Sequence, residues 1–197
     1  FREKEVLKPK FLKEEKGLSA AERGTVIHYV MQRLNYDRVS TISEIKSQIE
    51  EMIFDNSLTE KEASAVWYKK IYNFFNGKLG ERVLKAYKED RLVSRELPFF
   101  TELSSVEYDP ELNKEIYMDE KIRLQGIIDC FFEEEDGIVL LDYKTDYVEE
   151  GKVDEIIERY KSQIKYYKDA LEKIIGKRVK ESYLYLFNID KEILVEV

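Results

Sequence analysis

Two aspartates and a lysine interrupt the apolar stretch at residues 126–146, GIIDCFFEEEDGIVLLDYKTD. Asp129 stands inside the first apolar run, and Asp142 and Lys144 follow the second. Carboxylate oxygens are ligands that Mg²⁺ and Mn²⁺ prefer, and such an ion polarises a phosphoryl oxygen and lowers the pKa of a bound water. A neighbouring lysine would orient that water or neutralise charge that develops on the phosphate. The stretch is therefore a candidate site for metal-assisted chemistry on a phosphate group.

The two apolar runs are expected to pair as a β-hairpin, because Asp-Gly between β-prone segments favours a tight turn. With residues 136–137 as a two-residue loop, Phe131 pairs with Asp142, which leaves Asp129 diagonal to Asp142 on the same face of the sheet. Diagonal neighbours lie roughly 7 Å apart at the backbone. One divalent cation can bridge that gap.

Lys144 shares the face of Asp142, because side chains alternate along a strand, and Tyr143 points to the opposite face. Two carboxylates this close repel each other unless a proton or a cation lies between them. A simpler alternative is a solvated ion pair of Asp142 and Lys144 at the strand end, with Asp129 as an edge-strand charge. The hairpin alone does not separate these two interpretations.

The length and composition predict one domain with a sizeable core. The chain has 197 residues, of which 43% are hydrophobic and 38% charged, and its net charge is −8. We expect a single domain at residues 18–197, with a helical insertion at 42–90, and a linker-like lead-in at 1–17 from a longer polypeptide. The acidic charge argues against a free-standing, non-specific nucleic-acid binder, whose surface is usually basic. It does not exclude an enzyme whose acidic site is neutralised by a metal ion.

Cys130 is the single cysteine of the chain. Neither a disulfide nor a zinc or iron–sulfur site with several cysteine ligands can therefore form within the chain. A reducing, cytoplasmic compartment is expected for such a sequence. No apolar run approaches the roughly 18 residues of a membrane-spanning helix, and the start of the sequence has no signal-peptide character.

An early helix carries the only histidine of the sequence. Ser19 and Glu22 form a capping-box pattern, which predicts a helix that runs to about Leu34. His28 lies on the flank of the apolar stripe of this helix, one turn after Gly24, which would leave a side-chain gap beside it. His28 is thus either a metal ligand or a structural histidine.

The insertion at residues 42–90 is predicted to form three helices, at 43–54, 60–76 and 80–89. A second capping box begins at Thr59. We expect its apolar and aromatic residues to form ordinary helical core without chemistry: Val66, Trp67, Ile71, Phe74 and Phe75.

The period changes from helical to extended after the insertion. Residues 92–100 are predicted to form a strand, and Pro98 restricts its pairing to an edge or a bulge. Glu96 in this strand is either a site residue or an ordinary outward charge. Residues 101–117 are expected to be irregular, with a turn at 109–110.

A long helix is predicted at residues 153–175, followed by strands at 179–187 and 192–197. Gln163 and Tyr167 are four residues apart and share one flank of this helix. Their amide and phenol could hold a phosphate or a base. A packed tyrosine beside a solvated glutamine is the alternative.

Five short polar motifs, taken in their order along the chain, resemble the RecB-like branch of the PD-(D/E)xK nucleases. The resemblance extends from about residue 18 to 197. The elements that carry the resemblance are Gly24-x-x-x-His28, Arg95-Glu96, Gly126-x-x-Asp129, Asp142-Tyr143-Lys144-Thr145 and Gln163-x-x-x-Tyr167. Within this branch, residues 23–28, 126–130 and 140–146 are similar to the carboxy-terminal nuclease domains of the A subunits of bacterial AddAB-type helicase–nucleases. The first proline of the superfamily motif is absent, which is common in the RecB-like branch.

The resemblance implies an α/β fold of the restriction-endonuclease type, with a mixed central sheet flanked by helices and a helical insertion. It implies Mg²⁺ or Mn²⁺ as the cofactor. It also assigns roles to matching positions: His28, Asp129, Asp142 and the Tyr143 carbonyl as metal ligands, Lys144 as the catalytic lysine together with Glu96, and Gln163 and Tyr167 as DNA contacts.

The resemblance further implies an exonuclease tethered to a helicase motor and an AddB-type partner subunit, which processes DNA single strands at double-strand breaks for recombinational repair. ATP would be used by the motor alone, because this sequence has no Gly-x-x-x-x-Gly-Lys-Ser/Thr phosphate loop. Several relatives hold an iron–sulfur cluster with four cysteines, which a chain with Cys130 alone cannot do.

Two other functions remain open from the sequence. One is a catalytically silent module of the same fold that binds DNA or docks a subunit. The other is a stand-alone exonuclease of the phage type. The acidic net charge of −8 favours a motor that delivers the strand, because an isolated acidic domain would bind DNA weakly.

Overall fold

A five-stranded mixed sheet forms the centre of the computed structural model, which describes residues 18–105, 113–117, 119–149 and 151–197. The strands lie in the order β1-β2-β3-β4-β5; β3 and β4 are parallel, and the other neighbours are antiparallel. Their bounds are β1 Val93–Ser104, β2 Lys121–Glu134, β3 Gly137–Lys144, β4 Val179–Leu186 and β5 Lys191–Leu194. This architecture confirms the expected α/β fold with a mixed sheet.

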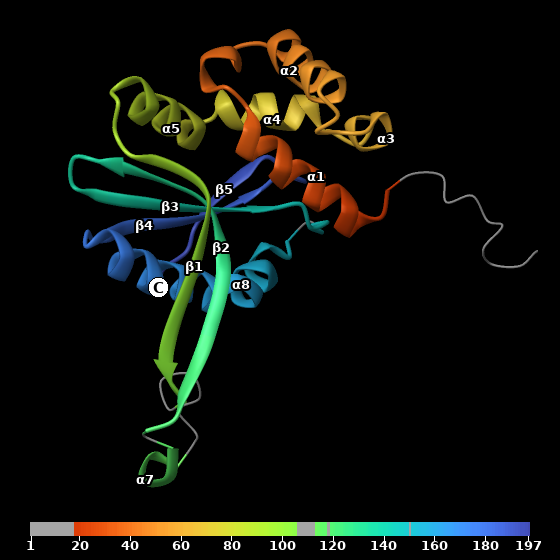
Figure 1. Ribbon diagram of the computed structural model, residues 1–197. Coiled ribbons are helices and arrows are strands. Elements are labelled where there is room, and N and C mark those ends of the chain that lie inside the picture. Colours follow the sequence, from red (N-terminus) through yellow and green to blue (C-terminus); the bar gives the residue numbers. More distant parts are fainter. Residues whose placement is uncertain (1–17, 106–112, 118, 150) are drawn as a thin grey trace, which may run out of the picture.

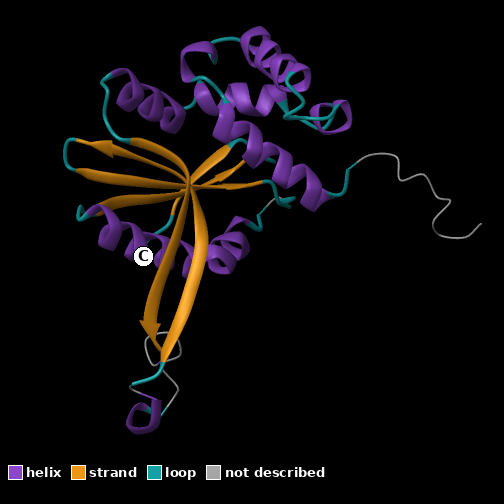
Figure 2. Ribbon diagram, viewed as in Figure 1, coloured by secondary structure: helices purple, strands orange, loops and turns teal. Residues whose placement is uncertain are grey.

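Helices cover both faces of the sheet (Figures 1 and 2). The helices of the first half of the chain lie on one face, and the long helix α8 lies on the other. Their bounds are α1 Ala20–Arg33, η2 Tyr36–Arg38, α2 Ile42–Phe54, α3 Glu60–Ala63, α4 Tyr68–Phe75, α5 Lys78–Lys88, α7 Lys114–Tyr117 and α8 Val153–Ile175. None of the helices in these ranges is long and apolar enough to span a membrane.

Strand β3 is buried on both faces and separates two hydrophobic cores. Val139 and Leu141 pack with the helices of the first half, whereas Ile138 and Leu140 pack with α8. A strand covered on both faces needs a near-continuous apolar run, which explains the sequence Ile138-Val139-Leu140-Leu141. Because side chains alternate along a strand, Asp142 and Lys144 point to the same face as Ile138 and Leu140, which is the face that α8 covers.

The capping signals place two helix ends correctly. Ser19 and Glu22 form the expected capping box at the start of α1. Helix α8 ends at Gly176, whose left-handed φ of 70° suits a residue without a Cβ. The predicted helix at 60–76 is wrong, because the chain breaks at residues 64–67 between α3 and α4. Ala63 and Val66 are both buried at this break.

The predicted register of the β2–β3 hairpin is also wrong, by two residues. Glu134 pairs with Gly137, and Cys130 pairs with Leu141. Gly137 is a strand residue rather than a turn residue, because it lies against β4, where a Cβ would come within 2.8 Å of the Arg178 carbonyl oxygen. A two-residue shift preserves the faces, so Asp142 still faces the predicted side.

Strands β1 and β2 continue beyond the rest of the sheet as a two-stranded arm (Figure 1). β1 extends to Ser104 and residues 114–117 form the short helix α7, so the expectation of irregular structure at 101–117 is wrong for its first four and last four residues. β1 is the edge strand, as Pro98 indicates. The expected turn at 109–110 and the lead-in at 1–17 lie outside the described residues.

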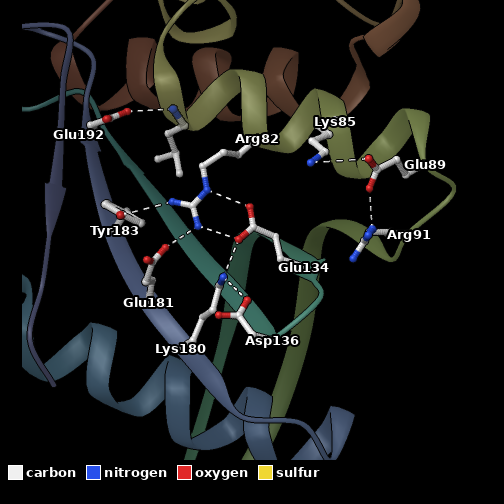
Figure 3. A network of polar contacts seen from close by, with 11 residues as sticks. Arg82, Lys85, Glu89, Arg91, Glu134, Asp136, Lys180, Glu181, Tyr183 and Glu192 are labelled. Atoms are coloured by element: carbon white, nitrogen blue, oxygen red, sulfur yellow. Dashed lines mark hydrogen bonds and ion pairs between the residues drawn. The ribbon is translucent and has the colours of Figure 1, made fainter.

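A network of charged side chains ties helix α5 to the sheet (Figure 3). Arg82 donates two hydrogen bonds of 2.9 Å to the two carboxylate oxygens of Glu134, and it also bonds Glu181. Lys180 pairs with Glu134 and with Asp136. The hydrogen bonds from Arg82, partly opposed by burial, lower the pKa of Glu134 to about 2.

Candidate metal-dependent active site

Helix α1 brings His28 to two carboxylates of the sheet. His28 Nδ1 lies 3.2 Å from Asp129 Oδ1 and 4.0 Å from Glu96 Oε1. One ligand atom from each of the three residues lies within 4.8 Å of the others. They line an open groove of about 420 Å³ that also contains Gly24 and Ile127, so a substrate can reach them.

Glu96 is turned into this groove by an unusual backbone conformation. Its φ is 54°, the left-handed region, although the neighbours Arg95 and Leu97 pair regularly with β2. Such a conformation costs on the order of 1–3 kcal/mol for a residue with a side chain, and it persists only where the surroundings enforce it. The preceding residue, Arg95, donates a hydrogen bond of 2.6 Å to the carbonyl oxygen of Leu34, just beyond the end of α1.

Asp129 lies where β2 separates from β3. The ladder between the two strands ends at Cys130 and Leu141, and the same register would place Asp129 directly opposite Asp142. Asp129 Oδ2 accepts a hydrogen bond of 2.7 Å from the backbone N–H of Tyr143, so its side chain replaces a backbone acceptor there. This bond fixes Oδ2 of Asp129 against β3, and the other oxygen, Oδ1, points toward His28.

Asp142 is almost fully buried, with 1% of its surface exposed. Lys144 Nζ forms an ion pair of 2.7 Å with Asp142 Oδ2, and no other described group donates a hydrogen bond to this oxygen. Burial, and then the nearby charge of Asp129, raise the pKa of Asp142 to about 7. The alternative of a solvated ion pair is therefore wrong.

Helix α8 surrounds the ammonium of Lys144. Gln163 Oε1 accepts a hydrogen bond of 3.1 Å from Lys144 Nζ, and Gln163 Nε2 donates one of 2.7 Å to the Tyr167 hydroxyl. The ammonium also lies 4.1 Å from the ring centroid of Tyr160. Burial, the largest single effect, lowers the pKa of Lys144, but the contacts with Asp142 and the charge of Asp129 together outweigh it, and the pKa is raised. Lys144 thus stays protonated.

Tyr160 was not among the residues expected at the site. The sequence places it in the apolar stripe of the long helix, three residues before Gln163, and this spacing was the only available signal. Its hydroxyl donates to Asp146, at 3.0 Å from Oδ1. The bond fixes the ring beneath the ammonium of Lys144.

Two glycines permit the close packing around the site. A Cβ on Gly24 would lie 2.9 Å from Thr145 Oγ1, so the space expected beside His28 is taken by the residue after Lys144. A Cβ on Gly126 would lie 2.7 Å from Phe99 Cε1 and 3.3 Å from Tyr167 Cε1. Both glycines are required by close approach rather than by backbone conformation.

The donor set fits a divalent cation. Burial and the charge of Asp129 raise the pKa of Glu96 as well as that of Asp142, as expected for carboxylates without enough positive charge nearby. Asp142 also keeps an oxygen without a hydrogen-bond donor in the described structure. The three residues whose ligand atoms lie close enough to share an ion are His28, Glu96 and Asp129, whereas the carboxylate of Asp142 forms an ion pair with Lys144.

Comparison with known proteins gives one family and many relatives. The model of the PD-(D/E)XK nuclease superfamily matches residues 1–196. Proteins described as the A subunits of ATP-dependent helicase/nucleases are similar: 50% identity over 195 residues in Clostridium perfringens (strain ATCC 13124), 48% over 195 residues in Clostridium beijerinckii, and 55% over 186 residues in Thermoanaerobacter pseudethanolicus. These matches cover 98%, 99% and 94% of this chain, but only 15%, 16% and 15% of the relatives.

Proposed function

The chain belongs to the PD-(D/E)XK nuclease superfamily, and from this premise we propose that it is a metal-dependent nuclease domain that hydrolyses DNA phosphodiester bonds. The observation that carries the proposal is the buried pair of Asp142 and Lys144 beside Asp129 and His28. A purely structural ion pair does not require two further titratable groups, His28 and Asp129, or an open groove beside it.

In this proposal His28, Asp129, Asp142 and the Tyr143 carbonyl hold Mg²⁺ or Mn²⁺. The ion, when bound, polarises a phosphoryl oxygen and lowers the pKa of a water molecule. Glu96 stands at the same groove and adds to its negative charge. The geometry supports His28 and Asp129 as a pair, and the carboxylate of Asp142 contributes the oxygen that lacks a hydrogen-bond donor.

Lys144 is the proposed catalytic lysine. Its ammonium stays charged beside Asp142 and would orient the attacking water or stabilise the charge on the phosphate. Gln163 and Tyr160 restrict its position from α8, which reduces the cost of arranging it for each turnover. Gln163 and Tyr167, which bond each other next to this lysine, are the proposed contacts to the DNA strand.

We further propose that the domain works within a longer helicase–nuclease that trims unwound strands at double-strand breaks as an exonuclease. The relatives are described as A subunits of ATP-dependent helicase/nucleases, and this chain spans about 15% of their length. A motor outside this chain would use ATP and deliver single strands, and an AddB-type subunit would be the partner, in the bacterial cytoplasm. The net charge of −8 is consistent with delivery by a motor rather than independent DNA capture.

A cleavage assay on single-stranded DNA with Mg²⁺ or Mn²⁺ tests this proposal. We expect the wild-type chain to cut and a Lys144→Ala variant to lose the activity while it still binds the metal. A catalytically silent module would show no metal-dependent cleavage in the wild type, and that result would contradict the proposal.

A further inference from the structure

A groove on the helical insertion combines aromatic rings with lysines. It has a volume of about 510 Å³ and lies between α2, α4 and Asn188, two residues beyond the end of β4. Helices α2 and α4 lie side by side above the sheet (Figure 1). The lining residues are Ile42, Lys46, Trp67, Tyr68, Lys69, Lys70 and Asn188. The lining thus contains three cations and no carboxylate, on a chain whose net charge is −8.

The aromatic rings are fixed rather than loose. Trp67 and Tyr68 are partly buried and pack against the core on the α1 side of the sheet. The guanidinium of Arg23 lies 5.6 Å from the ring centroid of Trp67, and Lys46 Nζ lies 5.7 Å from that of Tyr68. Rigid, half-exposed rings beside cations form a platform on which a flat group can stack.

Two of the three lysines in the groove, Lys46 and Lys69, are available to bind an anionic ligand. Lys70 bonds the carboxylate of Asp190 at 2.9 Å and is thereby neutralised. Lys46 and Lys69 are exposed, and neither forms an ion pair with a residue in the described ranges. Glu50 is close enough to raise the pKa of Tyr68, after the larger effect of burial, but it does not line the groove.

The groove is connected to the active site by short segments of chain. Asn188 follows Phe187, whose backbone N–H donates a hydrogen bond of 2.9 Å to the carbonyl oxygen of Lys144. On the other side, Arg23 touches Trp67, and the next residue, Gly24, lines the catalytic groove and contacts Thr145. The groove and the active site are therefore linked through residues 23–24 and 187–188.

From this arrangement we propose that the groove binds single-stranded DNA, whose bases stack on Trp67 and Tyr68 while Lys46 and Lys69 neutralise its phosphates. The inference rests on the proposed nuclease function and adds a binding surface to it. Stacking on aromatic rings tolerates any base, and lysines follow the backbone without reading sequence. Such a surface would hold a strand of any sequence beside the catalytic groove.

The single tryptophan of the chain allows a direct test, because Trp67 is its only indole fluorophore. Single-stranded DNA is titrated into the 197-residue chain in metal-free buffer, so that binding is measured without cleavage. We expect quenching of Trp67 emission, with an affinity that falls as salt increases. Labelled DNA followed by anisotropy reports total binding in parallel.

Variants assign the effect to the groove. Lys46→Ala with Lys69→Ala should lower the slope of log affinity against log salt by about 1.4, since each phosphate contact on a single strand contributes about 0.7. The matched control, Lys88→Ala with Lys173→Ala, removes two exposed lysines outside the groove and should leave the slope unchanged. Trp67→Ala should weaken binding on the order of tenfold, and Trp67→Phe should restore it.

The outcomes separate this inference from the proposed function. Quenching with the expected salt slopes supports the groove even if the chain does not cut DNA. Cleavage and anisotropy-detected binding without quenching overturn the groove and leave the nuclease. Quenching that both lysine pairs reduce equally also overturns it, because the charge effect is then not local. A Trp67 signal that responds to a partner protein but not to DNA assigns the groove to protein docking and overturns it as well.

Discussion

Two clusters of charged residues in this molecule show opposite electrostatic balances. In the network around Arg82, each oxygen of Glu134 accepts a hydrogen bond, and these bonds lower the pKa of Glu134 to about 2. In the active site, burial and Asp129 raise the pKa of Asp142 to about 7, and its Oδ2 accepts no hydrogen bond from a described residue. Both clusters contain several carboxylates. In the first, hydrogen bonds from Arg82 compensate the charge of Glu134. In the second, the ion pair with Lys144 does not keep the pKa of Asp142 in its ordinary range.

The difference separates a structural role from a functional one. A charged network with satisfied hydrogen bonds holds helix α5 on the sheet, and its removal should cost stability. Carboxylates that lack counter-charge cost stability themselves, and they are retained where a cation or a substrate supplies the balance. Substitutions in the two clusters should therefore have opposite consequences for stability and activity.

The largest effect is expected for Asp142→Asn, which should reduce metal-dependent cleavage by about a thousandfold or more. The amide has a similar shape but no charge for the metal or for Lys144. The free energy of unfolding should change by less than about 1 kcal/mol, because relief of the repulsion from Asp129 is offset by the loss of the counter-charge of the buried Lys144. Cleavage rates and urea unfolding of both proteins measure the two effects.

Asp136→Asn, in the turn of the same hairpin, is the matched control and should keep full activity. Turnover of Asp142→Asn within tenfold of the wild type would contradict the assignment of this carboxylate.

His28→Ala should weaken Mn²⁺ affinity by about tenfold to a hundredfold, because one ligand is lost while the carboxylates remain. Calorimetric titration of Mn²⁺ measures this change. Gln32→Ala, in the same groove, is the control and should bind the metal normally. Equal affinities for His28→Ala and the wild type would remove His28 from the site.

Arg82→Ala should lower the free energy of unfolding by about 2 kcal/mol, since it leaves Glu134 and Glu181 without their main partner at a partly exposed position. Mn²⁺ affinity should not change. Lys85→Ala, an exposed lysine on the same helix, should cost less than about 0.5 kcal/mol. A change in stability no larger than that of Lys85→Ala would show that the network is not structural.

Tyr160→Leu should lower kcat by about threefold to thirtyfold with little change in KM, because the ring that positions the ammonium of Lys144 is lost. Tyr160→Phe keeps the ring and should retain most of the rate, although it loses the hydrogen bond to Asp146. Steady-state kinetics of the two variants separate the ring from the hydroxyl. Equal losses would assign the role to the hydroxyl instead.

The smallest effect concerns the pH dependence of stability. The pKa of Glu134 is lower in the folded chain, about 2 against an ordinary 4.5, so its contribution is complete above about pH 4.5 and is lost as the pH falls toward 2. Glu134→Gln should remove a contribution on the order of 1 kcal/mol after solvent screening is allowed for. Unfolding of both proteins between pH 2 and 6 should show curves that converge at low pH. Parallel curves would contradict the lowered pKa.

The sequence predicts the parts of the fold that depend on local signals. The capping box at Ser19 and the apolar spacing of residues 153–175 place α1 and α8. The predicted hairpin register is wrong because Gly137 lies against Arg178, the residue just before β4, and this contact comes from a distant part of the chain. The site face is nevertheless right, since a shift of two residues preserves the side to which Asp142 points.

The candidate site is less accessible to sequence reasoning where it depends on tertiary structure. The left-handed conformation of Glu96 and the ring of Tyr160 beneath Lys144 arise from contacts between separate elements. Trp67 was expected to be plain core, yet it lines an open groove because the helix at 60–76 breaks just before α4. The roles of the eight proposed site residues remain predictions.

A crystal soaked in Mn²⁺ tests the central claim most directly. The account predicts an anomalous peak in contact with His28, Asp129 and Asp142, with the carbonyl oxygen of Tyr143 nearby and Lys144 moved off Asp142 Oδ2. The Arg82 network, in which both oxygens of Glu134 accept hydrogen bonds from Arg82, should show no peak in the same crystal. A peak at that network alone, or none at the site at millimolar Mn²⁺, would contradict the account.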